Sequence, residues 1–118
     1  MPDALIAWFE DIGRGDVAMV GGKNASLGEM VGALSKRGIR VPGGFATTAQ
    51  AYRHYIAANG IEPEMRRWIE ALDAGRASLQ VAGAAIRHAF LEGAFPPEIE
   101  AAIGEAYDAL SARSEQET

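Results

Sequence analysis

The feature that most constrains the fold is a series of apolar stripes that begins at Leu27 and continues to Leu110. Within each stripe the apolar side chains recur every three or four residues, and glycine or proline separates one stripe from the next. This period places apolar residues on one face of an α-helix, so the stripes predict five helices around one core. The stripes are Leu27, Met30, Val31 and Leu34; Tyr52, Tyr55 and Ile56; Met65, Trp68, Ile69 and Leu72; Leu79, Ala82, Ile86 and Phe90; and Ile99, Ala102, Ile103, Ala106 and Leu110.

The residues between the stripes predict where these helices begin and end. Glycine accepts the left-handed backbone that commonly ends a helix, which predicts stops at Gly38, Asn59-Gly60, Gly75 and Gly93. Hydroxyl side chains cap helices and proline suits a first helical position, which predicts starts at Thr47 or Thr48, Pro63, Ser78 and Pro96-Pro97. Thr47 also has capping-box spacing to Gln50.

The front of the chain has a different pattern, with short apolar runs that lack a helical period. "ALIAWFEDI", residues 4–12, is followed by the turn cluster Gly13-Arg14-Gly15-Asp16, which indicates a strand and then a loop. "IRVPGGFATTA", residues 39–49, is expected to be extended, because Pro42 disfavours helical angles at the residue before it. The sequence therefore predicts a predominantly helical α+β fold, with about five helices and a small N-terminal β element.

The composition excludes several classes of function. The 118 residues include 11 basic and 16 acidic side chains, for a net charge of −5, so the chain lacks the basic surface that binds nucleic acid. The absence of cysteine excludes disulfides, thiol catalysis and cysteine-based zinc sites. No apolar run reaches the roughly 18 residues of a membrane span, and the N-terminus lacks the positive region of a signal peptide. We therefore expect a cytoplasmic protein.

The stretch most indicative of a ligand is "VGGKNASLGEM", residues 20–30. Gly21 and Gly22 allow the backbone to approach a ligand that a side chain would block. The start of the following helix presents unpaired N–H groups and the positive end of the helix dipole. Lys23 adds a mobile positive charge. Together these are the parts of a phosphate-binding loop.

Named phosphate-binding motifs do not describe this loop. A Walker A loop fails twice, because Val17 stands where its first glycine is required and Asn24 stands where Ser or Thr is required. The spacing of a Rossmann fingerprint is met by Gly13, Gly15 and Ala18, but a second Gly-Gly break follows instead of a long helix. An ordinary Gly-Gly turn beside a solvated lysine remains open at this point.

The strings themselves are more informative. "VGGKNASLGEM", followed by "GIRVPGGFATTAQAYRHY", closely resembles the N-terminus of the phosphoenolpyruvate synthase family, whose relatives include pyruvate phosphate dikinase and rifampicin phosphotransferase. The resemblance is strong from Asp11 to Tyr55 and extends, in its helix pattern, to Arg113. The Asn24-Ala25-Ser26 version is more similar to the synthases than to their relatives, which tend to have Gly-Ala-Asn there.

This resemblance implies that residues 1–113 are the first part of an ATP-grasp nucleotide-binding domain, with a polar tail at residues 114–118. Lys23 matches the lysine that reaches the ATP phosphates, and Gly21 and Gly22 match its glycines. In the family, ATP pyrophosphorylates a histidine on a swivelling domain, and water then removes one phosphate. The remaining phosphoryl group passes to pyruvate, yielding phosphoenolpyruvate, AMP and phosphate, and Mg²⁺ accompanies the nucleotide.

The resemblance also implies that most of the machinery lies outside this segment. In the family, an Arg-Ser-Ser stretch whose arginine also holds phosphate comes soon after the helix that here ends near Arg113, and this sequence does not contain it. The sequence also lacks the acidic metal ligands, the second ATP-grasp subdomain, the phosphohistidine domain and the pyruvate-binding domain of the family. His54 and His88 lack the small-residue context of the phosphorylated histidine, and Glu10 and Glu29 have no partner for acid–base catalysis. We therefore expect no catalytic residue and no metal ligand here: the parent chain is expected to be a phosphotransferase, and the isolated 118 residues inactive.

Two other interpretations stay open from the sequence. The chain could be a free-standing module that binds a nucleotide or a partner protein without chemistry. It could also be the front end of a rifampicin-type antibiotic phosphotransferase, which shares this loop. The partners expected under the leading interpretation are ATP and the remainder of the enzyme.

Overall fold

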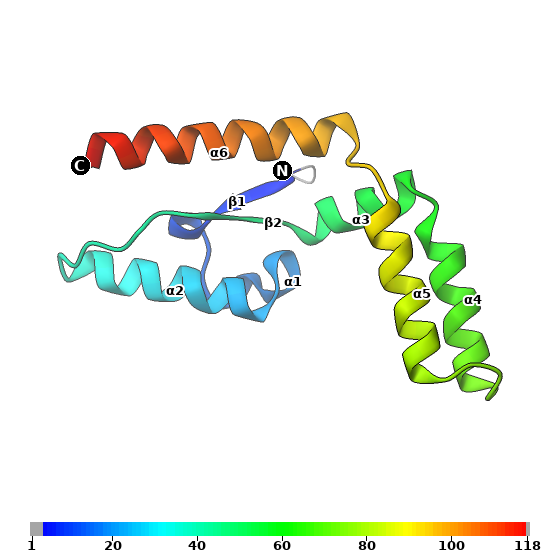
Figure 1. Cartoon of the computed structure of the whole chain (residues 1–118). Coiled ribbons are helices and arrows are strands. Elements are labelled where there is room, and N and C mark those ends of the chain that lie inside the picture. The colour runs from blue at the N-terminus through cyan, green and yellow to red at the C-terminus, as the bar shows by residue number, and fades with distance from the viewer. Residues whose placement is uncertain (1–3, 118) are drawn as a thin grey trace. The chain divides into compact units, whose positions relative to one another are not determined.

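The computed structural model describes residues 4–117, which form two compact units (Figure 1). One unit combines the N-terminal part of the chain up to Tyr52 with the C-terminal part from Pro97 onward, and we call it the split unit. The other, the inserted unit, is Arg53–Pro96. The fold is mostly helical with one small sheet, as the α+β prediction requires.

The sheet of the split unit has two antiparallel strands, β1 (Ile6–Trp8) and β2 (Phe45–Thr47), with Ala7 opposite Ala46. Backbone hydrogen bonds continue this pairing beyond both strands. The Phe9 N–H donates to the Gly44 carbonyl and the Thr48 N–H donates to the Leu5 carbonyl, each at 3.1 Å. The sheet thus joins the two segments that the sequence predicts to be extended.

The helical elements of the split unit are the 3₁₀ turns η1 (Phe9–Asp11) and η2 (Arg14–Asp16), α1 (Val17–Val20), α2 (Gly22–Lys36), the first turn of α3 (Ala49–Ala58) and α6 (Pro97–Glu117). Figure 1 shows the sheet between α6 above and α2 below. The three short elements η1, η2 and α1 occupy the region that the sequence assigns to a strand end and a loop. Their lengths of three and four residues are too short to produce a periodic signal.

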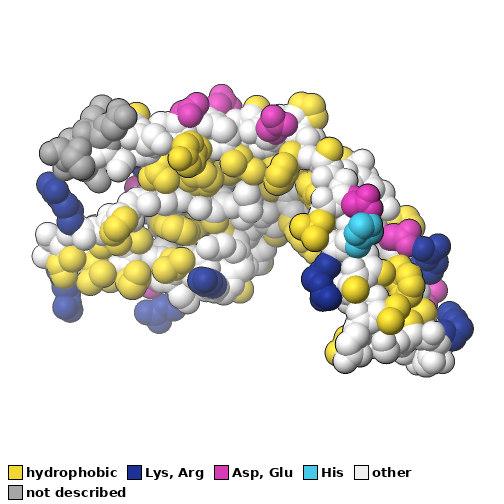
Figure 2. All heavy atoms as spheres, viewed as in Figure 1, with side chains coloured by type: hydrophobic (Ala, Val, Ile, Leu, Met, Phe, Trp, Pro, Cys, Tyr) yellow, Lys and Arg dark blue, Asp and Glu magenta, His cyan; other side chains and the backbone are white. Residues whose placement is uncertain are grey.

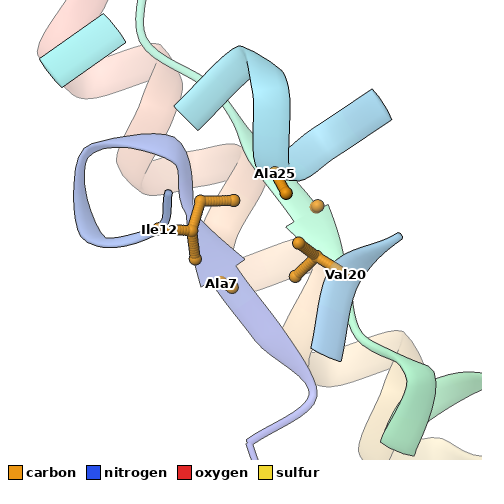
Figure 3. Close-up of a cluster of buried hydrophobic side chains, with 5 residues drawn as sticks. Ala7, Ile12, Val20 and Ala25 are labelled. Atoms are coloured by element: carbon orange, nitrogen blue, oxygen red, sulfur yellow. The ribbon is translucent and has the colours of Figure 1, made fainter. Parts of the chain in front are cut away.

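The core of the split unit is made of small and medium apolar side chains. Figure 3 shows four of them converging from β1, the end of η1, α1 and α2. The full cluster is Ala7, Ile12, Val20, Ala25 and Ala46. Because three of its five members are alanine, the elements that carry them approach one another closely.

Helix α2 packs through a face that differs in part from the predicted stripe. Its buried residues are Ala25, Gly28 and Val31, whereas Met30 is 46% exposed. A Cβ at Gly28 would lie only 2.4 Å from the Ile12 carbonyl oxygen, so the backbone after η1 runs directly against α2. The prediction placed the larger side chains inward, but small residues make this contact because no space exists for larger ones.

The inserted unit contains the rest of α3, α4 (Ile61–Asp73) and α5 (Leu79–Glu92), and α4 packs against α5. Ile61 and Ala82 are its most deeply buried side chains, each 2% exposed. The Tyr55 hydroxyl donates to the Phe90 carbonyl at 2.6 Å. Leu79 was predicted to face inward but is 68% exposed; it is the first residue of α5, directly after the loop that joins α4 to α5.

Most of the predicted helix ends are confirmed. Gly38 and Gly75 have φ of +78° and +76°, and each follows the last turn of a helix. After α2, the Gly38 N–H donates to the Ser35 carbonyl and the Ile39 N–H to the Leu34 carbonyl, both at 3.0 Å, which is the Schellman pattern. The Ser78 hydroxyl accepts from the Val81 N–H at 3.1 Å and caps α5 as predicted.

One predicted helix start is confirmed and another needs correction. Of the two candidate caps of α3, Thr47 and Thr48, the cap is Thr48: its Oγ1 accepts from the Ala51 N–H at 3.2 Å while donating to the Ala4 carbonyl at 2.7 Å. Pro63 is the third residue of α4, because Gly60, with φ of +61°, already turns the chain into the helix before it. Among the described residues, no helix is long and apolar enough to cross a membrane.

Candidate functional site

The Gly-Gly-Lys loop (residues 21–23) lies where α1 ends and α2 begins. Gly21 has φ of +85° and ψ of 162°, a backbone conformation that a residue with a side chain adopts only under strain. Gly22 and Lys23 are the first two residues of α2. A Cβ at Gly22 would meet no atom within 4 Å, and its φ is not positive, so neither packing nor backbone strain requires glycine there.

The first turn of α2 leaves backbone donors available. The Ala25 N–H donates to the Gly21 carbonyl at 3.0 Å and closes the first turn of the helix. The N–H groups of Gly22, Lys23 and Asn24 precede that bond and have no acceptor inside the helix. The Asn24 side chain turns back, its Nδ2 donating to the Val20 carbonyl at 2.9 Å. These donors therefore lie at the N-terminal end of a helix of 15 residues, beside the Asn24–Val20 contact.

The charge at this end of α2 is positive and uncompensated within residues 4–117. The Lys23 side chain is exposed, and none of the ion pairs in this part of the chain involves it. The first turn contains no acidic residue. A lysine at this position adds its charge to the positive end of the helix dipole, an arrangement that costs about 0.3–1 kcal/mol by itself. An anion bound at this end of the helix would offset that cost.

One side chain near the loop makes a contact that the sequence did not predict. Glu29 on α2 was expected to have no role, yet its Oε1 accepts a hydrogen bond from the backbone N–H of Arg14 at 2.9 Å. The two residues are 15 positions apart, so no local pattern could reveal the contact. Asp16 makes a second contact in the same turn, accepting from the Gly13 N–H at 2.9 Å.

A separate hollow of about 670 Å³ lies in the split unit, at the other end of α2 from Lys23. Its charged lining includes Glu10 and Arg113, which pair with each other at 2.8 Å. The Arg113 guanidinium also lies 4.1 Å from the centre of the Trp8 ring. Arg113 thus serves to pack α6 against Glu10 and the Trp8 ring of the sheet. None of the residues that line the hollow belongs to the Gly-Gly-Lys loop.

The remaining residues singled out by the sequence are dispersed. His54 and His88 are both exposed, and His88 pairs with Glu92 on the same helix. No group of three or more histidine or acidic side chains that could hold a metal ion occurs within the described residues. On the face shown in Figure 2, lysine and arginine side chains are scattered and do not gather into a broad basic patch.

Comparison with known proteins identifies the family to which the chain belongs. Residues 17–118, which include the whole Gly-Gly-Lys loop, match the family described as "Pyruvate phosphate dikinase, AMP/ATP-binding domain". The chain belongs to this family, as the resemblance of its loop and of "GIRVPGGFATTAQAYRHY" predicted.

The chain is also similar to several phosphoenolpyruvate synthases. The chain is 48% identical over 111 residues to phosphoenolpyruvate synthase of Synechocystis sp., an alignment that covers 93% of this chain and 14% of that protein. It is 44% identical to the phosphoenolpyruvate synthases of Neisseria meningitidis and Escherichia coli, over 113 and 112 residues. These alignments cover 95% and 94% of this chain and 14% of each relative. The chain therefore spans about one seventh of the length of these relatives.

Proposed function

We propose that this chain is the segment that receives the ATP phosphates in a phosphoenolpyruvate synthase-like dikinase. The observation that carries the proposal is the placement of Lys23 in the first turn of α2, where its charge and the helix dipole both favour an anion. The match to an AMP/ATP-binding family supplies the chemical class of that anion.

Each part of the loop has a separate task in this proposal. Gly21 supplies the turn with positive φ that starts α2, and Gly22 leaves open space through which a phosphate can reach the backbone. The free N–H groups of the first turn would bind phosphate oxygens, and Lys23 would neutralise part of their charge. Phosphoryl transfer depends mostly on such positioning and neutralisation.

The described residues fit the nucleotide phosphates but not the metal. Backbone donors and a lysine suit phosphate oxygens, whereas Mg²⁺ requires carboxylates or substrate phosphates, and no acidic cluster is present among residues 4–117. We therefore assign no Mg²⁺ ligand to this segment, and propose that the metal is bound with the nucleotide by residues elsewhere in the enzyme.

The proposed parent reaction converts ATP, pyruvate and water into AMP, phosphoenolpyruvate and phosphate in the cytoplasm. It requires a second ATP-grasp subdomain, a phosphohistidine domain and a pyruvate-binding domain, for which the greater length of the relatives leaves room. Residues 1–113 would be the first part of the ATP-grasp domain. No residue of the segment is assigned a catalytic role.

The test is an NMR titration of the chain with Mg-ATP. One charge-assisted contact contributes about 1.5–3 kcal/mol, far less than the roughly 8 kcal/mol of micromolar binding, so we expect millimolar affinity with shifts centred on residues 21–26. Lys23→Ala should remove these shifts. The matched control is Lys36→Ala, at the opposite end of the same helix. Binding centred elsewhere, or unaffected by Lys23→Ala, would contradict the proposal.

A further inference from the structure

The Gly-Gly-Lys loop is preceded by a segment that α2 itself holds in place. This segment, residues 13–20, contains η2 and α1 and leads directly into Gly21. At its far end, the Gly21 N–H donates to the Val17 carbonyl at 2.7 Å, and Asn24 Nδ2 donates to the Val20 carbonyl. The geometry of the loop therefore depends on where the segment begins as well as on where it ends.

Two consecutive residues of α2 fix that beginning. At Gly28 the helix touches the backbone of Ile12, and at Glu29 the side-chain carboxylate accepts from the Arg14 N–H. The Gly13 N–H, between these two contacts, donates to Asp16. Each of the three contacts involves a residue between Ile12 and Asp16. Two of them bind this stretch to α2, and the third binds it to itself.

Gly13 shows how closely the Glu29 carboxylate lies against the start of the segment. A Cβ at Gly13 would lie 2.8 Å from Oε1 of Glu29, which is closer than such atoms are found in proteins. The φ of Gly13 is −155°, an extended value that any residue adopts, so backbone strain does not require glycine there. The carboxylate of Glu29 is what occupies the space that a side chain at position 13 would need.

We propose that Glu29 is a positioning residue for the Gly-Gly-Lys loop: its carboxylate holds the start of the segment that places Gly21 and the first turn of α2. This inference rests on the proposed function, because it concerns the same phosphate site. Glu29 lies six residues beyond Lys23 on α2, about 9 Å along the helix axis. It therefore acts through the segment rather than by contact with a phosphate.

A positioning role and a purely electrostatic role predict opposite results. Removing a negative charge near an anion site strengthens anion binding, so an electrostatic role predicts tighter Mg-ATP binding for both Glu29→Ala and Glu29→Gln. A positioning role predicts weaker binding for Glu29→Ala only, because Gln keeps an oxygen that can accept from the Arg14 N–H. Rescue by the amide thus distinguishes the two.

The experiment compares four variants of the 118-residue chain by NMR, each checked for folding by thermal unfolding. Glu29→Ala and Gly13→Ala both disturb the carboxylate contact, and we expect them to move the amide resonances of residues 21–24 in the ligand-free chain. We also expect them to weaken Mg-ATP binding about threefold to tenfold, the effect of losing one hydrogen bond. Glu29→Gln and Gly15→Ala are the controls, since a Cβ at Gly15 meets no atom within 4 Å.

Each outcome decides the proposal. Unchanged loop resonances and unchanged affinity in a folded Glu29→Ala variant would overturn it, as would tighter binding in both Glu29 variants. A lowered unfolding midpoint with normal affinity would show that Glu29 serves stability alone. If the unsubstituted chain shows no Mg-ATP shifts at residues 21–26, the proposed function fails, while the ligand-free resonances still show whether Glu29 positions the loop.

Discussion

Each of the two units has its own internal packing, and the kind of contact differs between them. In the split unit, segments far apart in sequence pack directly against the bare backbone of glycine, as where the Ile12 carbonyl touches Gly28 and where the Phe9 ring lies against Gly44. In the inserted unit, consecutive helices pack through side chains, and the Tyr55 hydroxyl and the Asn59 amide bind backbone groups near the end of α5.

This difference determines what each unit tolerates. Where another segment lies directly against a glycine, no room is left for a side chain, so the split unit should be sensitive to added side-chain volume at these positions. A helical pair packed through side chains should be sensitive mainly to the loss of buried atoms. The Gly-Gly-Lys loop lies in the first kind of unit, where long-range contacts set the start of the helix that presents it.

The largest effect is expected from Gly28→Ala in the split unit. The added Cβ would lie 2.4 Å from the Ile12 carbonyl oxygen and 2.5 Å from its Cγ1. Overpacking usually costs about 1–3 kcal/mol, and we expect about 4 kcal/mol or more here because backbone must move. Chemical denaturation measures this. Gly32→Ala on the same helix has open space around it and should stabilise the chain by about 0.5–1 kcal/mol. Equal effects of the two changes would contradict the close contact.

A large loss confined to the inserted unit is expected from Ile61→Ala. Ile61 is 2% exposed, and deleting such a side chain costs about 2–5 kcal/mol. Hydrogen exchange should show lost protection in α4 and α5, with the amides of α2 retaining theirs. Equal loss of protection in α2 would mean that the two units unfold together, and the comparison between them would then not extend to their stability.

An intermediate effect is expected where a glycine is required in the inserted unit. A Cβ at Gly93 would lie 2.4 Å from the Tyr55 hydroxyl oxygen, so Gly93→Ala should cost about 1–3 kcal/mol. Tyr55→Phe removes that oxygen and its hydrogen bond to Phe90, at a cost of about 1 kcal/mol. In a double-mutant cycle, Gly93→Ala should therefore cost less when Phe stands at position 55. Additive effects would show that the atoms left in place, Cζ of residue 55 and Cγ of Asn59 at 2.9 and 3.0 Å from that Cβ, are what exclude a side chain at position 93.

The smallest effect is expected from Arg113→Ala on α6. The ion pair with Glu10 is about half exposed, with side-chain exposures of 46% and 49%. Such pairs contribute about 0–1 kcal/mol, and we expect a total loss of about 1 kcal/mol, part of it from the contact with the Trp8 ring. Adding salt should lower the effect of Arg113→Ala if the ion pair contributes. A loss as large as that of Ile61→Ala would show that α6 depends on this residue to pack.

The helix ends illustrate what the sequence by itself determined. Gly38, Gly75 and Ser78 act within one turn of their own positions, through a positive φ or one hydroxyl acceptor, so their neighbours in sequence are sufficient to predict them. Gly21, which precedes α2 with φ of +85°, also acts at its own position, because glycine accepts that backbone conformation. Family membership was also predicted from the sequence strings "VGGKNASLGEM" and "GIRVPGGFATTAQAYRHY", because they resemble the family without any need of a structure.

Only the tertiary structure decided which surfaces these elements use. Residue patterns favoured Met30 as a core residue, but α2 turns Gly28 inward because the backbone at Ile12 lies against it. Thr48 caps α3 because its hydroxyl also reaches Ala4, 44 residues away. Glu29 bonds the Arg14 N–H across 15 residues. Such contacts depend on how distant segments approach in space, and no periodicity within one segment contains that information.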